Sequence, residues 1–455
     1  MSRRVAVTGI GVVTSLGLST AEFWAGCLEG RSVVAAIPEN WREFADYHSG
    51  IWSPLPPLGA ESLGASRVEL AQNDPVSLMA ANAAMEALSG SGLSVEEKNK
   101  RARTSFVVGI DPARAGVYMG TGIGGASTFL QNHSYQSLAR QKQHLGKIRD
   151  SLGEDSRARE LDEILTKLVI GPRFNPFVVS MLMPNAVSSL LGLKFTFTGP
   201  NVTYTIACAS GTVAIGNAFR AIRDGDIDIA LAGGSEYLDD HYGGIFLGFD
   251  IAGALVRDCD DPDRANRPFD ERRSGFLFSQ GGAAVLVLED WDRAIGRGAA
   301  VLAEVAGYGE SFDAHSMMQI DPEGVEIERM IRTALDDARI GPRDIQYVNA
   351  HGTGTQANDP TEAAIIERVF GREVMVNSTK SLLGHTIGAS GAIEAAVTAL
   401  SLKDQLTHGC RNLERPIAAL NFVRSVEPRN MSAAFTQSFA FGGHNAGLVL
   451  RRFAG

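Results

Sequence analysis

The sequence has 455 residues, of which 44% are hydrophobic and 21% charged, a composition typical of a folded globular protein. Its formal net charge of −10 argues against a nucleic-acid-binding protein, because no long run of Lys and Arg offsets it. No stretch approaches the roughly 18 uninterrupted apolar residues that a membrane-spanning helix requires.

The cysteines are far apart in the sequence and form no C-x-x-C pair; they are Cys27, Cys208, Cys259 and Cys410. This spacing argues against both a cysteine-bound zinc ion and a disulfide framework. We therefore expect a reduced, cytoplasmic protein without a metal site. Residues 1–17 superficially resemble a secretory signal, but glycines interrupt the apolar run, which we interpret as a buried strand and turn.

Five segments of the first half have counterparts, in the same order, in the second half. The types in order are a strand with a glycine turn, a helix, a second strand with a glycine-rich turn, a small-residue helix opening with Ser-Gly, and a further strand. The pairs are 4–17 with 302–309, 80–93 with 331–342, 115–125 with 345–355, 210–222 with 390–402, and 227–234 with 432–443. This order predicts an α/β protein of two βα-rich halves, residues 1–290 and 291–455, packed about a pseudo-dyad.

One segment, residues 133–171, has no counterpart in the other half. It is rich in Lys, Arg, Glu and Gln, with leucines spaced along it. We interpret it as a charged insertion of one or two exposed helices, broken near Gly153.

Cys208 lies in the segment TIACASGTVAIG, where an apolar run gives way to a small-residue helix. This order predicts a thiol at a strand-to-helix turn, close to free backbone N–H groups. Those groups and the helix dipole are expected to lower the pKa of the thiol and to stabilise a developing oxyanion. A buried cysteine is usually inert, but the very small neighbours here leave room for a substrate.

Two histidines lie in similar glycine-rich turns. His351 is part of VNAHGTGTQANDPTE, at the end of a predicted strand, and His385 is part of NSTKSLLGHTIGASG, shortly after Lys380. A single histidine of this kind is more often structural than catalytic. Three such turns in corresponding places of a duplicated fold favour a shared site that includes Cys208.

Four ordered motifs together resemble the β-ketoacyl-acyl carrier protein synthases, including elongating synthases II of bacterial fatty acid synthesis and polyketide ketosynthases. They are ACASG at 207–211, HGTGT at 351–355, Lys380 with GHTIGASG ending at Gly391, and FAFGGHNA at 439–446. The resemblance covers nearly the whole chain. It implies the thiolase fold, a duplicated α/β core layered α-β-α-β-α, which agrees with the internal repeat.

The resemblance also implies an acyltransferase reaction. Cys208 takes an acyl chain from a carrier-protein or CoA thioester, and His351 and His385 promote loss of CO₂ from the malonyl thioester. The resulting carbanion attacks the acyl-Cys208 thioester and releases a 3-oxoacyl product. A thiolate is both a good nucleophile and a good leaving group for such chemistry. Apart from these thioester substrates, which a phosphopantetheine arm or CoA carries, no cofactor is implied.

Further positions follow from the same resemblance. Backbone N–H groups of Cys208 and Phe441 form the oxyanion hole, and Phe441 also gates the acyl pocket. Lys380 orients the site and pairs with Glu394, for which we expect a structural role. The remaining positions implied to contact substrate are Thr353 and Thr355 on the phosphopantetheine arm, Gly442 and Gly443 in the glycine loop, and Ile123 and Phe249 at the acyl tunnel.

The partners implied are an acyl carrier protein and a second copy of the chain in a homodimer. A heterodimer with a ketosynthase-like subunit remains open. Three departures from the family pattern together suggest a specialised synthase. His444 replaces the usual Thr after Gly-Gly, Ser279-Gln280 replaces Gly followed by an acid, and the 133–171 insertion lengthens the stretch between the GTGIGG turn and Cys208.

Other interpretations fit less well. A Rossmann-type reductase lacks the third glycine in TGIGVVTSLG, where Thr14 stands. A degradative thiolase needs a second cysteine in the C-terminal glycine loop, which here reads FGGHN. A Cys-His hydrolase does not account for the second histidine. The non-enzyme alternative is a ketosynthase-like partner subunit, but such subunits typically lose the nucleophile.

Overall fold

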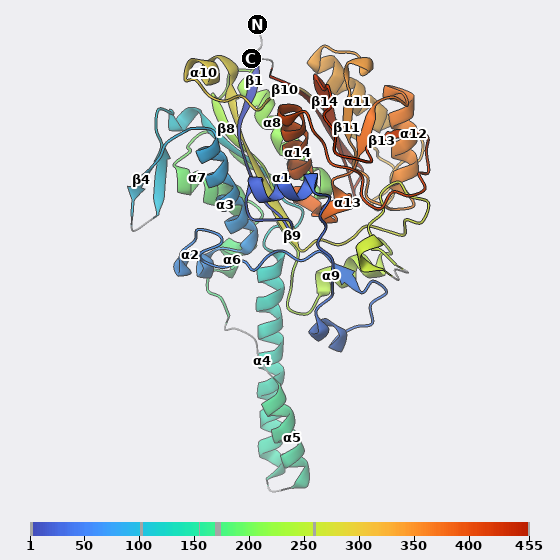
Figure 1. Ribbon diagram of the computed structural model, residues 1–455. Helices are drawn as coiled ribbons and strands as arrows, with labels where there is room; N and C mark the ends of the chain where they lie inside the picture. The colour runs from blue at the N-terminus through green and yellow to red at the C-terminus, as the bar shows by residue number, and fades with distance from the viewer. Residues whose placement is uncertain (1–2, 101–102, 154, 169–173, 258–260, 454–455) are drawn as a thin grey trace.

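The computed structural model describes residues 3–100, 103–153, 155–168, 174–257 and 261–453. Its centre is an 11-stranded mixed sheet in the order β13-β12-β11-β14-β15-β10-β1-β9-β8-β6-β7 (Figure 1). The first half of the chain supplies β1 (Val5–Val13), β6 (Ala115–Gly120), β7 (Asn201–Tyr204), β8 (Ile229–Tyr237) and β9 (Gly281–Asp290). The second half supplies β10 (Ala303–Phe312), β11 (Tyr347–Asn349), β12 (Met375–Asn377), β13 (Asn421–Phe422), β14 (Ala433–Ala440) and β15 (His444–Arg451).

The strand order confirms the internal duplication. Outward from the centre, the first half runs β1-β9-β8-β6-β7 and the second runs β10-β15-β14-β11-β12, with β13 added at the edge. The two innermost strands, β1 and β10, pair antiparallel, so that the halves share one continuous sheet. The division of the chain at residue 290 therefore stays a prediction.

Helices form three layers around the two halves of the sheet. In the first half, α3 (Pro75–Gly90) and α7 (Ala186–Phe195) pack with the strands in one core. In the second half, α11 (Val325–Ala338) and α12 (Asn358–Phe370) do the same. The third core contains the central helices α8 (Ser210–Arg223) and α14 (Ser390–Asp404). This confirms the predicted α-β-α-β-α layering.

Shorter elements complete the described parts of the chain. The helices are α1 (Thr20–Leu28), α2 (Arg67–Gln72), α6 (Val178–Leu182), α9 (Gly244–Ile251), α10 (Trp291–Gly296) and α13 (Lys380–Leu383). The strands are β2 (Ala35–Ala36), β3 (Ile51–Trp52), β4 (Val95–Asn99) and β5 (Thr104–Val107). Within the described ranges, no helix is both long and apolar enough to cross a membrane.

The charged insertion forms a helical hairpin that projects from the body of the protein (Figure 1). Its arms are α4 (Ala126–Leu152) and α5 (Ser156–Lys167), and an ion pair between Arg149 and Asp162 joins them at 2.8 Å. The predicted break at Gly153 agrees with a backbone φ of 58° there. The first helix begins already at Ala126 rather than near residue 133, because it continues directly from the glycine-rich turn after β6. Residues 154 and 169–171 of the predicted insertion, like Cys259, lie outside the described residues.

Candidate active site

Cys208 occupies a tight turn between β7 and α8. The turn is a 3₁₀ segment, Ala207–Ala209, and Ala207 has a positive φ of 46°, which is uncommon for a residue with a side chain. The Ser210 hydroxyl stabilises this turn, because it accepts the Ile206 N–H at 2.9 Å and donates to the Ala207 carbonyl at 2.7 Å. The thiol is thereby presented next to the N-terminus of α8, with 4% of Cys208 exposed.

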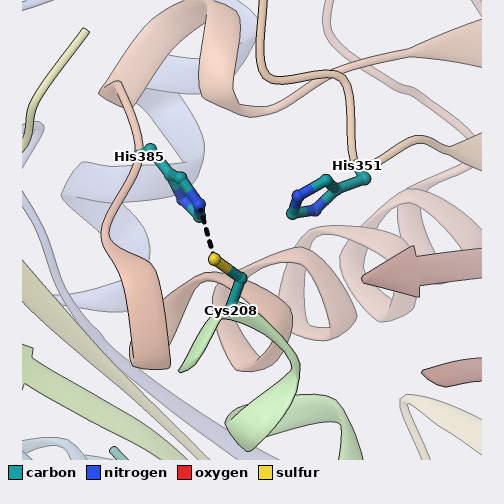
Figure 2. Close-up of side chains that lie close together, drawn as sticks. All are labelled: Cys208, His351 and His385. Atoms are coloured by element: carbon teal, nitrogen blue, oxygen red, sulfur yellow. Dashed lines mark hydrogen bonds between the residues drawn. The ribbon is translucent and has the colours of Figure 1, made fainter. Parts of the chain in front are cut away.

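His385 reaches Cys208 from the second half of the chain. Its Nε2 atom lies 3.0 Å from the Cys208 Sγ atom (Figure 2). The loop is fixed by the His385 N–H, which donates to the Leu277 carbonyl at 2.8 Å. Unlike His351, His385 does not directly follow a strand. The short helix α13 intervenes after β12, and it buries Lys380 between the histidine loop and α14.

His351 lies just beyond the end of β11, as predicted, and its ring faces both Cys208 and His385 (Figure 2). The N–H groups of His351 and Gly352 each donate to the Glu362 carboxylate at 2.7 Å, which fixes the turn. The Lys380 Nζ atom lies 3.2 Å from the His351 Nδ1 atom. Lys380 also forms a buried ion pair with Glu394, as predicted.

The hydrogen bonds determine which nitrogen carries the proton in each neutral imidazole. The Ile387 N–H donates to the His385 Nδ1 atom at 3.3 Å, so the proton of the neutral ring lies on Nε2. At His351, the Lys380 ammonium donates to Nδ1, with the same result. Both rings therefore present an Nε2–H group as a donor.

Burial and charge set the protonation states. Burial, followed by the positive charge of Lys380, lowers the pKa of His351 and of His385 well below the usual value, so both rings are neutral at pH 7. Burial raises the pKa of the Cys208 thiol to about 12. The expectation of a lowered thiol pKa is therefore wrong for the substrate-free site. Lys380 and the backbone N–H of Phe441 stabilise the thiolate, but they do not outweigh desolvation.

A cavity leads to these residues. Its lining includes the predicted nucleophile, both predicted histidines, Thr353, Thr355 and Phe441. Several other lining residues were not indicated by the sequence. The lining residues are Cys208, Phe276, Asp313, Met318, Gln319, Ile320, His351, Thr353, Thr355, Ala357, Asn358, His385, Phe439, Ala440, Phe441 and Asn445. The hydroxyls of Thr353 and Thr355 lie 3.0 Å apart on one wall.

Other predicted substrate positions lie outside this lining. Gly442 and Gly443 form the β14–β15 turn with φ values of 90° and 84°, conformations that glycine adopts readily. Phe249 packs on Phe276, at 5.7 Å between ring centroids, and so lies behind the wall of the cavity. Ile123 is 39% exposed in the single chain.

Neither His444 nor the Ser279-Gln280 pair lines the cavity. The His444 ring packs on Phe312, at 5.1 Å between ring centroids, and does not line the cavity. Ser279 is fully buried beside the His385 loop. The Gln280 amide donates to Asp239 at 2.9 Å and accepts the Leu55 N–H at 2.7 Å, so it holds the partly buried Asp239 carboxyl in place.

Three functional candidates were missed because they depend on tertiary packing. Phe276 forms a wall of the cavity and contacts the His385 ring at 5.1 Å between ring centroids. Glu362 supports the His351 turn, and Asp313 accepts a hydrogen bond from Asn445 at 2.5 Å at the cavity wall. Of these three, only Glu362 could have been found from the sequence, as an acidic residue shortly after the HGTGT motif.

The potential ligand atoms of Cys208, His351 and His385 lie within 4.8 Å of one another, close enough to hold a metal ion. The adjacent Lys380 ammonium argues against a dication there, because like charges repel strongly in a buried site. The same charge favours an anionic intermediate.

The protein-family model of the β-ketoacyl synthase N-terminal domain matches residues 2–293 of the sequence. The family model of the C-terminal domain matches residues 302–414. The 3-oxoacyl-[acyl-carrier-protein] synthase 2 of Coxiella burnetii is 33% identical over 459 residues, which is 99% of each chain. The enzyme of the same name from Vibrio cholerae is 33% identical over 462 residues, with 99% of each chain covered.

Solved structures agree with these sequence matches. A β-ketoacyl synthase from Burkholderia phymatum superposes with a TM-score of 0.82 at 29% identity, over 99% of this chain and 100% of the other. The ishigamide ketosynthase/chain length factor superposes with a TM-score of 0.80 at 29% identity, over the whole of both chains. A ketosynthase in complex with its type II PKS acyl-carrier protein superposes with a TM-score of 0.79 at 27% identity, again over the whole of both chains.

Proposed function

The chain belongs to the β-ketoacyl synthase family, and we propose on this basis that it catalyses decarboxylative Claisen condensation of an acyl-Cys208 thioester with malonyl-acyl carrier protein. The product is a 3-oxoacyl-acyl carrier protein, in fatty acid or polyketide-type biosynthesis. One observation carries the residue assignment. Both histidines have Nδ1 occupied by a donor, which leaves two neutral Nε2–H groups beside the Cys208 sulfur.

In the first step, the Cys208 sulfur attacks the carbonyl carbon of the incoming acyl thioester. The Nε2–H group of His385 and the Lys380 charge stabilise the thiolate as it forms. Backbone N–H groups of Cys208 and Phe441 already face the sulfur, and they hold the oxyanion of the tetrahedral intermediate. The intermediate collapses with release of the carrier thiolate, which takes up the proton that Cys208 loses, and the acyl group stays on Cys208.

In the second step, the malonyl thioester enters past Thr353 and Thr355, whose hydroxyls bind the phosphopantetheine arm. Its thioester oxygen accepts hydrogen bonds from the Nε2–H groups of His351 and His385. These donors stabilise the enolate that forms as the C–C bond to CO₂ breaks. Because both rings are already neutral donors, no proton has to be removed from them first.

In the third step, the enolate carbon attacks the acyl-Cys208 carbonyl carbon, and the Cys208 thiolate leaves. No cofactor beyond the phosphopantetheine of the carrier or CoA takes part. The side chains of Cys208, His351 and His385 lie together in one site, which favours independent catalysis. A non-catalytic partner subunit would have no use for this arrangement.

For assembly, we propose a homodimer in the cytoplasm. Strand β7 ends the sheet, and no described strand of the same chain pairs with its outer side, which makes it a template for a second chain. Nearby α6 and α7 carry exposed apolar side chains, including Val179 at 67% and Leu193 at 69% exposure. Sedimentation velocity tests this: a monomer of 48.4 kDa in isolation would contradict the homodimer and favour a separate partner subunit.

The catalytic proposal is tested with acyl-carrier protein thioesters of several chain lengths, with and without malonyl-carrier protein. Intact-mass spectrometry follows the wild type and Cys208→Ala. We expect acylation of the wild type alone and a 3-oxoacyl product when malonyl-carrier protein is present. Failure of the wild type to accept an acyl group from any carrier or CoA donor would contradict the proposal.

A further inference from the structure

The pseudo-dyad gives the Cys208 turn a counterpart in the second half. The 3₁₀ turns Ala207–Ala209 and Ile387–Ala389 each precede a central helix, at Ser210 in one case and Ser390 in the other. Each opens on a residue with a positive φ, 46° for Ala207 and 48° for Ile387. Gly388 therefore occupies the place that corresponds to Cys208, and its N–H corresponds to the proposed oxyanion donor of Cys208.

The turn that carries His351 likewise has a counterpart after β6. In the second half, the N–H groups of this turn donate to Glu362. In the first half, the Gly122 and Ile123 N–H groups donate to Glu236 at 2.5 and 3.3 Å, and the Thr121 hydroxyl donates at 3.2 Å. Glu236 stands at the end of β8 and is fully buried.

The Glu236 carboxylate also receives the Gly388 N–H, at 3.0 Å to Oε2. It therefore joins a turn of the first half to the turn that follows His385 in the second half. The fit leaves no room for a side chain at Gly388, where a Cβ atom would lie 2.6 Å from Oε2 and 2.2 Å from the Gly122 nitrogen. Within the described residues, no Lys or Arg side chain lies within ion-pair distance of Glu236; backbone N–H groups and one hydroxyl are its donors.

We propose that Glu236 is a positioning residue for decarboxylation, in that it holds the Ile387–Ala389 turn so that the His385 ring keeps its Nε2–H group on the reacting atoms. Ile387 lies between Gly388 and His385 in the chain, and its N–H donates to the His385 Nδ1 atom. A displacement of Gly388 therefore moves Ile387 and turns the His385 ring. This role rests on the proposed condensing activity and adds a residue that touches no substrate.

Glu236→Gln tests the proposal with a nearly isosteric change. Each carboxylate oxygen accepts two donors: Oε2 from Gly122 and Gly388, and Oε1 from Thr121 and Ile123. A glutamine amide must point an NH₂ group at one of these donor pairs, which repels it. We expect decarboxylation of malonyl-carrier protein to acetyl-carrier protein and CO₂ to slow on the order of 10²-fold, as a misplaced catalytic group does. Acylation of Cys208 should change by less than about 3-fold, because the oxyanion donors stay in place.

Glu289→Gln is the matched control. Glu289 is a fully buried carboxylate on the neighbouring strand β9, bound by Arg297 and the Thr8 hydroxyl, and it is remote from the cavity. We expect it to lower stability and to leave the ratio of the two partial reactions at the wild-type value. The inference is overturned when Glu236→Gln slows both partial reactions equally, or neither.

Thr121→Val provides a second variant should Glu236→Gln fail to fold, because it removes only one donor to the carboxylate. It should slow decarboxylation several-fold with little effect on acylation, and equal effects on both reactions would overturn the inference. A wild-type protein that performs neither partial reaction would instead refute the condensing activity itself.

Discussion

The Nε2 atom of His385 lies 3.0 Å from the Sγ atom of Cys208, although the two residues are 177 positions apart in the sequence. One residue belongs to each half of the duplicated fold. The contact is therefore sensitive to anything that shifts the two central turns relative to each other. In the proposed mechanism, this contact also joins the acylation step at the sulfur to the decarboxylation step at the imidazoles.

Cys208→Ala should abolish acylation of the protein and formation of a 3-oxoacyl product, because no other described thiol faces the cavity. Cys410→Ala is the matched control, since Cys410 is also a buried free thiol but packs in the core of the second half. Intact-mass spectrometry after incubation with acyl-carrier protein separates the two variants. Acylation of Cys208→Ala at the wild-type level would place the nucleophile elsewhere.

The raised pKa of Cys208 predicts slow alkylation at neutral pH in the absence of substrate. Burial disfavours the thiolate, so the thiolate fraction should keep rising through pH 10, whereas a free thiol levels off above its pKa of about 8.5. The measurement is the rate of iodoacetamide labelling at Cys208 from pH 6 to 10, followed by peptide mapping. A plateau below pH 9 would show that the thiolate is better stabilised than burial allows.

The lowered pKa of His385 predicts a pH-dependent contribution to stability. In the unfolded chain the ring gains its proton near pH 6.5, whereas in the folded protein it stays neutral to lower pH. The unfolded state thus binds more protons below pH 6.5, and the contribution of His385 to stability is lost as the pH falls. Urea unfolding of the wild type and of His385→Gln from pH 8 to 5 isolates the contribution of His385 to stability. The stability of the wild type relative to the variant should decrease on acidification, and a constant difference would contradict the assignment.

Lys380→Met should destabilise the protein by about 3–5 kcal/mol, because it leaves the Glu394 carboxylate buried without its cation. The double variant Lys380→Met/Glu394→Gln should recover most of this stability, since no isolated charge remains. Both should decarboxylate malonyl-carrier protein poorly, because the His351 Nδ1 atom has lost its donor. Urea unfolding measures the stability of both variants, and the yield of acetyl-carrier protein measures their decarboxylation activity. Recovery of decarboxylation along with stability would assign Lys380 a purely structural role.

Thr353→Val should raise KM for malonyl-carrier protein with little change in kcat, because we propose that the hydroxyl binds the carrier arm rather than the reacting atoms. The loss of one hydrogen bond, about 1 kcal/mol, corresponds to about a 5-fold change. Thr333→Val on the exposed side of α11 serves as the control for the same isosteric change. A fall in kcat at constant KM would instead place Thr353 next to the reacting carbons.

Much of the architecture could be predicted because its signals are local. Glycine turns after β-branched runs, and small-residue helices opening with Ser-Gly, recur in both halves, and the strand order places each pair in corresponding positions. The same turns led to Cys208, His351 and His385. Helix α13 was missed because its four residues are too short to carry a helical pattern.

The electrostatics of the site could not be predicted, because they depend on burial rather than on neighbours in the sequence. The helix terminus beside Cys208 suggested a stabilised thiolate, but full burial outweighs the dipole. The role of Glu236 was also hidden, since its donors come from two turns that are distant in the sequence. Met318 and Ile320 line the cavity from a loop without a recognisable pattern.

The central position of α14 has a consequence for synthesis of the protein on the ribosome. Every residue of α14 from Ser390 to Leu402 is buried, and its neighbours in the core include α8 of the first half. At translation speeds of about 5–20 residues per second, the first half is complete about 5–20 seconds before α14 is available to cover it. During that interval the apolar face of α8 is open to solvent. Chaperone demand for the nascent chain should therefore be greatest after the first half is complete and should end only when α14 is inserted.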